Sequence, residues 1–118
     1  MNTFYDLLQE AEDAFERVWF IQAVQDIERT DLTLSLRLYI RADVFVHVFY
    51  GQLSDSLYFS LIEHGRRIFG IDRESGEWHL HPYNAPEKHL PFSEGLGQRP
   101  LLSFLIFVED LLLQHELL

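Results

Sequence analysis

The sequence contains no cysteine. Disulfide cross-links, thiolate zinc sites, iron–sulfur clusters and a cysteine nucleophile are therefore excluded. Basic residues are also few, with nine Lys and Arg against nineteen Asp and Glu, and the formal net charge is −10. Proteins that bind nucleic acid through counterion release are usually basic overall, so this balance argues against tight, unaided RNA or DNA binding and leaves only a local basic site.

The first fifteen residues also lack a basic segment followed by an apolar one, so no signal peptide is expected and the cytoplasm is the predicted location. Apolar and aromatic residues, in contrast, are plentiful. Hydrophobic residues make up 47% of the chain, which excludes an intrinsically disordered protein. A length of 118 residues fits a single domain spanning 1–118.

The hydrophobic pattern predicts an α+β fold. Residues 3–17 carry apolar side chains from Phe4 to Phe15 at helical spacing, which predicts an amphipathic N-terminal helix. Residues 19–28 are rich in β-branched and aromatic side chains and are predicted as a strand, with a continuation of the helix as the alternative. Alternating segments joined by short polar turns complete an antiparallel meander sheet of five or six strands: 32–40, 44–51, 56–65, 66–72 and 77–83.

The C-terminal part of the chain differs in character. A long irregular loop is expected at 82–100, which holds all four prolines. Residues 101–118 are predicted as a helix that is apolar on nearly every side, and acidic residues such as Glu109 argue against a membrane span. One small sheet cannot cover such a helix, so we expect part of 101–118 to pack on the sheet and part to bind another chain in a homodimer or hetero-oligomer.

A cluster of histidines is the main candidate for chemistry. His79 and His81 lie two apart on a predicted strand, so both rings point to one face, and His89 follows in a loop that could fold back. Imidazoles suit acid–base cleavage of RNA, in which one ring takes the proton of the ribose 2′-OH and another protonates the leaving oxygen; this needs no metal or cofactor. The expected substrate-binding residues are the nearby bases and one aromatic: Arg66, Arg67, Arg73, Tyr83 and Lys88.

Two alternatives stay open for these histidines. His79, His81 and His89 could hold Zn²⁺ as a three-histidine open site, or they could be ordinary surface residues. Their spacing does not separate these interpretations. Elsewhere, His47 is expected to be a core or supporting histidine, and Gly70 within a strand indicates a bulge or a close backbone approach.

The segment 66–92, RRIFGIDRESGEWHLHPYNAPEKHLPF, resembles the signature region of the TumE-like toxin family, small proteins encoded beside a DNA-binding antitoxin. The matching features are Trp78-His79, His81, the Asn-Ala-Pro of 84–86, and His89. The resemblance implies a cytoplasmic, ribonuclease-like growth inhibitor that a cognate antitoxin neutralises. The competing interpretation is a non-enzymatic interaction module that dimerises through its C-terminal helix.

Overall fold

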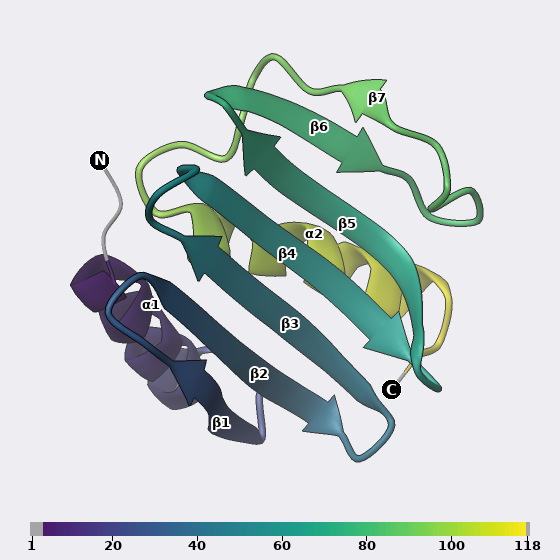
Figure 1. The fold of residues 1–118 in the computed structure, drawn as a ribbon. Helices are drawn as coiled ribbons and strands as arrows, with labels where there is room; N and C mark the ends of the chain where they lie inside the picture. Colours follow the sequence, from purple (N-terminus) through teal and green to yellow (C-terminus); the bar gives the residue numbers. More distant parts are fainter. Residues whose placement is uncertain (1–3, 118) are drawn as a thin grey trace.

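The computed structural model describes residues 4–117 and confirms the α+β class. Within that range, one antiparallel sheet has its seven strands in sequence order, and helices α1 and α2 both lie on one face of it (Figure 1). The elements are α1 (Phe4–Arg17), β1 (Ala23–Arg29), β2 (Thr33–Arg41), β3 (Val44–Gly51), β4 (Ser56–Glu63), β5 (Arg66–Glu74), β6 (Glu77–His81), β7 (Leu90–Pro91) and α2 (Pro100–Gln114). The meander is as predicted, but the strands number seven rather than five or six.

The N-terminal and C-terminal edges of the sheet account for the differences from the prediction. At one edge, β1 begins at Ala23 rather than at residue 19, because Phe20 and Ile21 turn into the core between α1 and the strand. At the other edge, β7 is a two-residue strand inside the expected irregular loop, where it pairs with β6. Pro91 is tolerated there because an outer edge strand needs no further amide donor.

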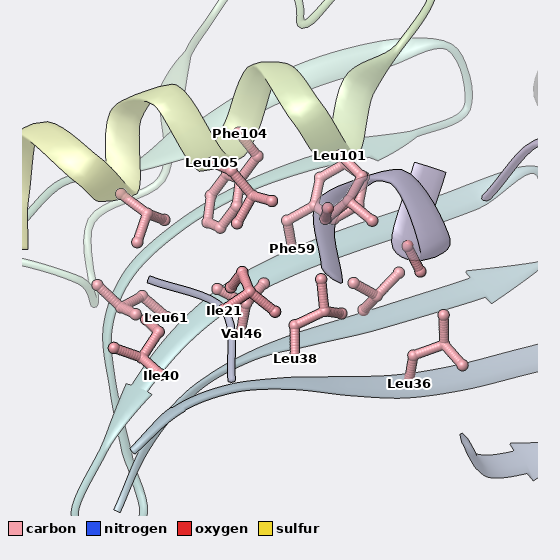
Figure 2. Packing of buried hydrophobic residues seen from close by; sticks show 14 of the residues in the cluster. Ile21, Leu36, Leu38, Ile40, Val46, Phe59, Leu61, Leu101, Phe104 and Leu105 are labelled. Carbon is pink, nitrogen blue, oxygen red and sulfur yellow. The ribbon is translucent and has the colours of Figure 1, made fainter. Parts of the chain in front are cut away.

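Strand alternation sorts the side chains onto two faces. On β2 to β4 alternate residues are buried beneath the helices, and Phe69 and Ile71 of β5 continue this layer. The sheet thus contributes these residues to the core: Leu34, Leu36, Leu38, Ile40, Val44, Val46, Val48, Tyr50, Leu57, Phe59, Leu61, Phe69 and Ile71. Figure 2 shows Phe104 of α2 beside Phe59 and above this layer. The Phe104 ring stacks on Phe59 and on Phe69, with centroids 5.4 and 5.6 Å apart. A stacked aromatic trio therefore fixes α2 on the sheet.

The two helices bury different amounts of apolar surface. Helix α1 turns Leu7, Ala11 and Ala14 inward, whereas Phe15, expected on its buried face, is 54% exposed. Helix α2 is covered along one side only, so that Ile106 and Leu113 stay exposed. No helix among the described residues is long and apolar enough to cross a membrane.

The second face of the sheet has no helix on it in Figure 1, and we call it the open face. Residues paired in an antiparallel ladder point to the same side. The pairing therefore aligns one row of open-face positions across β2 to β6: Arg37, His47, Ser60, Gly70 and His81. This row ends at the histidines that the sequence singles out.

Candidate functional site

Strand β6 places His79 and His81 on the open face. The register pairs His79 with Asp72 and His81 with Gly70, both on β5. Asp72 is buried, and its Oδ2 lies 3.0 Å from Nε2 of His81, its diagonal neighbour across the two strands. The strand pair thus holds one imidazole against a carboxylate that water barely reaches.

His89 joins these two rings from the loop that follows β6. Two successive turns reverse the chain, as the N–H of Ala85 donates to Pro82 and the N–H of Lys88 donates to Ala85. The ring of His89 then lies 4.0 Å from that of His79 and 5.0 Å from that of His81, between centroids. We call Asp72, His79, His81 and His89 the His cluster. The three histidines lie together, whereas their catalytic role stays a prediction.

Hydrogen bonds fix the protons of His81. Its Nδ1 lies 3.1 Å from the carbonyl oxygen of Pro86, which can only accept, so Nδ1 carries a hydrogen. On the other side, Nε2 faces the Asp72 carboxyl group, and a second hydrogen must lie between those two atoms for a bond to form. The Asp72–His81 pair therefore shares one transferable proton next to His89, which is exposed.

A β-bulge brings Arg67 to the same face. The register between β4 and β5 shifts so that Leu61 pairs with Phe69 while Ile62 pairs with Arg67, leaving Ile68 as the extra residue. Regular alternation from Phe69 would have put Arg67 on the helix side. Instead, Nη2 of Arg67 donates to the carbonyl of Pro86 at 3.1 Å. One carbonyl oxygen thus accepts from both Arg67 and His81.

Gly70 permits this arrangement. A Cβ atom at Gly70 would lie 3.1 Å from the carbonyl oxygen of Phe59 and 3.4 Å from the Arg67 side chain. The predicted close backbone approach is therefore present at Gly70, and the bulge lies just before it at Ile68.

Beside the His cluster lies a polar surface hollow. Its lining includes Glu63, Arg66, Arg67, Tyr83, Asn84 and Pro86. Arg67 and Pro86 connect the hollow to the His cluster, because the Pro86 carbonyl accepts hydrogen bonds from both Arg67 and His81. We call this the arginine hollow; it unites three of the five predicted substrate-binding residues, namely Arg66, Arg67 and Tyr83.

The other two predicted binding residues lie outside the hollow. Arg73 points to the helix side, where it pairs with Asp55 at 3.0 Å and its guanidinium lies over the ring of Trp78. Its alternation on β5, opposite to that of Asp72, directs it away from the open face. Lys88 is exposed on the loop just before His89. Tyr83, although it lines the hollow, stacks on His115 at the end of α2.

Asp72 is the site residue that the sequence interpretation missed. It lies two residues from Gly70 on β5, and only the strand register reveals that it faces the same side as His79 and His81. His47, expected in the core or in a supporting position, lies outside the core, half-buried on the open face with Nε2 3.0 Å from Oγ of Ser35. Burial and the nearby Arg37 lower the pKa of His47.

Three residues of the His cluster could coordinate a metal ion. Asp72, His81 and His89 each offer one ligand atom, and these atoms lie within 4.8 Å of one another. The set differs from the three-histidine site considered above, because Asp72 takes the place of His79. Two imidazoles and one carboxylate suit first-row transition ions.

No family model, curated protein or solved structure matches this chain. The features of the chain that bear on its function are therefore the His cluster, the arginine hollow and the exposed side of α2.

Proposed function

We propose that the protein cleaves RNA by acid–base catalysis at the His cluster and serves as the toxin of a toxin–antitoxin pair in the cytoplasm. The observation that carries the proposal is the continuous contact from Asp72 through His81 and His89 to His79. Cleavage through the ribose 2′-OH needs one group that gives a proton and one that takes it, within reach of a single phosphate. Neighbouring imidazoles in unlike surroundings meet that need.

The unlike surroundings of the histidines support different roles for them. His81 is buried and shares a proton with Asp72, and it acts as the acid when its Nε2–H turns from Asp72 to the leaving oxygen, which breaks the hydrogen bond to Asp72. His79 has no carboxylate partner among the described contacts and acts as the base that takes the 2′-OH proton. His89, exposed, stacked on His81 and tilted against His79, is the auxiliary group that contacts the phosphate.

The arginine hollow supplies local positive charge on a chain that is negatively charged overall. The formal net charge of −10 repels RNA at long range, so a phosphate needs local cations. Arg66 and Arg67 are the first residues of β5 and both line the hollow, and Arg67 reaches the edge of the His cluster through Pro86. Guanidinium groups bind phosphate in two-pronged geometry and stabilise its growing charge during cleavage.

Cleavage of a fluorogenic RNA oligonucleotide tests this directly. His79→Ala and His81→Ala should each lower the rate by roughly 10²-fold or more, the usual contribution of a general acid or base. The matched control is His47→Gln, since His47 lies on β3, contacts Ser35 and lines neither the His cluster nor the arginine hollow. A substrate with 2′-deoxyribose at the cleaved position should be resistant, because it lacks the attacking hydroxyl group.

Growth assays in an inducible host give the cellular counterpart. The wild type should inhibit growth and the double variant of His79 and His81 should not, with folding of both checked by circular dichroism. A folded double variant that cleaves RNA and inhibits growth like the wild type would show that the His cluster is not the active site.

The exposed side of α2 favours a second candidate function. Ile106, Phe107 and Leu113 are 70, 40 and 61% exposed, an apolar strip typical of a protein interface. In the toxin proposal this strip binds the cognate antitoxin; in the alternative, a non-enzymatic module dimerises through it. Sedimentation of the wild type and of Ile106→Glu separates the two, since only the module requires a dimer that this charge disrupts.

A further inference from the structure

We propose that Asp72, His81 and His89 bind one divalent first-row transition-metal ion, with Zn²⁺ as the representative. Each residue presents one donor atom, and the three atoms lie within 4.8 Å of one another on the open face. Imidazole nitrogen suits zinc, copper, iron and nickel, and one carboxylate adds the negative charge that holds a dication. Hard ions such as Mg²⁺, which prefer all-oxygen ligands, do not fit this set.

The hydrogen bond from Nδ1 of His81 to Pro86 is the first independent support. A histidine that binds metal through one ring nitrogen almost always donates the other N–H to a carboxylate or a carbonyl, which fixes the orientation of the ring. His81 has this arrangement in place, with Nδ1 3.1 Å from the Pro86 carbonyl oxygen and Nε2 directed at Asp72. Arg67 donates to the same carbonyl and holds it in position.

The Asp72 carboxylate is the second support. Its Oδ1 is buried without a hydrogen-bond partner among the described residues, an expensive state for a carboxylate oxygen. The Oδ2 atom lies 3.0 Å from Nε2 of His81, whereas two ligands about 2.1 Å from one tetrahedral ion are separated by about 3.4 Å. An ion can therefore replace the shared proton once the two side chains separate by about 0.4 Å.

His89 is the ligand that has to adjust. Two ligands of one tetrahedral ion stand about 3.4 Å apart, so donor atoms as far as 4.8 Å from each other must close by more than about 1 Å. His89 is exposed and lies at the end of the 82–89 loop, whereas Asp72 and His81 are buried on paired strands. Closure by this one side chain leaves the remaining coordination positions open to water.

Metal binding has a consequence for activity that rests on the proposed function. An ion bound to Nε2 of His81 displaces the proton shared with Asp72 and so removes the acid of the cleavage reaction. The site would therefore be a switch: metal-free protein cleaves RNA, and Zn²⁺ stops cleavage. The binding itself does not depend on the protein being a ribonuclease.

Titration of tag-free protein with Co²⁺, followed by its visible absorption bands and then by Zn²⁺ competition, tests the site. We expect saturation at one ion per chain. Asp72→Asn and His89→Ala should weaken binding by more than about 100-fold, since loss of an outer hydrogen-bond partner alone costs roughly 10–100-fold. His79→Ala and His64→Ala are matched controls that should retain wild-type affinity.

The outcomes separate the two proposals. The absence of saturable binding, or binding that is lost with His79→Ala and kept with Asp72→Asn, overturns this site whatever the RNA assay shows. His89→Ala keeps the test decisive, because an exposed loop residue is replaced without risk to the fold. If metal-free wild type cleaves no RNA, the proposed function fails while the Co²⁺ result stands. Zn²⁺ that binds without slowing cleavage contradicts the switch.

Discussion

Glu10 and Asp72 are both buried carboxylates, 3 and 5% exposed, yet their surroundings differ completely. Glu10 lies in the helix layer, where its Oε1 accepts hydrogen bonds from the backbone N–H groups of Leu101 and Leu102. Asp72 lies on the open face, where it contacts an imidazole that can lose or gain a proton. Each carboxylate leaves its second oxygen without a hydrogen-bond partner among the described residues.

The comparison shows that the partner, rather than the burial, decides what a buried carboxylate does. Helix α2 has no side-chain cap of its own at Arg99, so Glu10 of α1 supplies the acceptor for its first free amides. A backbone amide keeps its proton, so the partners of Glu10 cannot give up a proton to make room for another ligand. Around Asp72, His81 can exchange its proton, and the exposed His89 gives solvent and ligands access.

The largest expected effect sharpens the contrast between the helix side and the open face. Phe104→Ala removes the ring that stacks on Phe59 and Phe69, and should lower the free energy of unfolding by about 3–5 kcal/mol. The matched change on the open face is Phe49→Ala, for which we expect a loss of about 1 kcal/mol, because its ring is half-exposed. Urea unfolding followed by circular dichroism measures both losses. Equal losses would mean that the open face is packed as tightly as the core.

The next effect concerns the carboxylate of the helix layer. Glu10→Ala leaves the amides of Leu101 and Leu102 without their acceptor, and should lower the free energy of unfolding by about 1–3 kcal/mol. Glu10→Gln keeps an oxygen at the same place and is expected to lose much less at neutral pH. If Ala and Gln lower stability equally, the hydrogen bonds to α2 contribute nothing.

The pKa of Glu10 also predicts in which direction the free energy of unfolding changes with pH. Burial raises its pKa above the ordinary value of 4.5, despite the opposing hydrogen bonds from Leu102 and Leu101. The protonated form is therefore favoured in the folded state, and its contribution to stability is complete below pH 4.5 and is lost as the pH rises through the raised pKa. The stability of the wild type relative to Glu10→Gln should fall over that interval. Urea unfolding of both proteins at a series of pH values measures the difference.

Much of the fold was predictable because local alternation decides it. The strand at 44–51 was predicted with the bounds that the structure shows, since its apolar residues alternate without a break and a turn precedes it. β7 was not predicted, because two residues carry no periodicity and its only support is pairing with β6. The start of β1 was predicted too early because Phe20 and Ile21 look like strand residues in the sequence, whereas in the structure they precede the strand and are buried in the core.

The candidate site was predictable only in part, for a related reason. His79 and His81 share a face by spacing alone, but the bulge that turns Arg67 to that face depends on pairing between β4 and β5. Asp72 joins His81 through the same kind of long-range register. Glu10 meets Leu101 across 91 positions of the chain, which no local pattern encodes.

The smallest expected effect concerns His47, which lies on the open face and, unlike His81, has no carboxylate partner among the described contacts. Nε2 of His47 lies 3.0 Å from the hydroxyl group of Ser35, and burial together with Arg37 holds its pKa below the ordinary 6.5. Its neutral form is favoured in the folded state, so its contribution to stability is present above pH 6.5 and is lost as the pH falls through the lowered pKa.

Two measurements check this. In an NMR titration, the His47 ring should have its midpoint below pH 6.5. The stability of the wild type relative to His47→Gln should be greater at pH 7.5 than at pH 5, because glutamine keeps a polar group near Ser35 and does not titrate. A midpoint at or above 6.5 would show that the open face around His47 is as wet as free solvent. The difference between the open face and the core would then be larger than the half-buried side chains of β3 suggest.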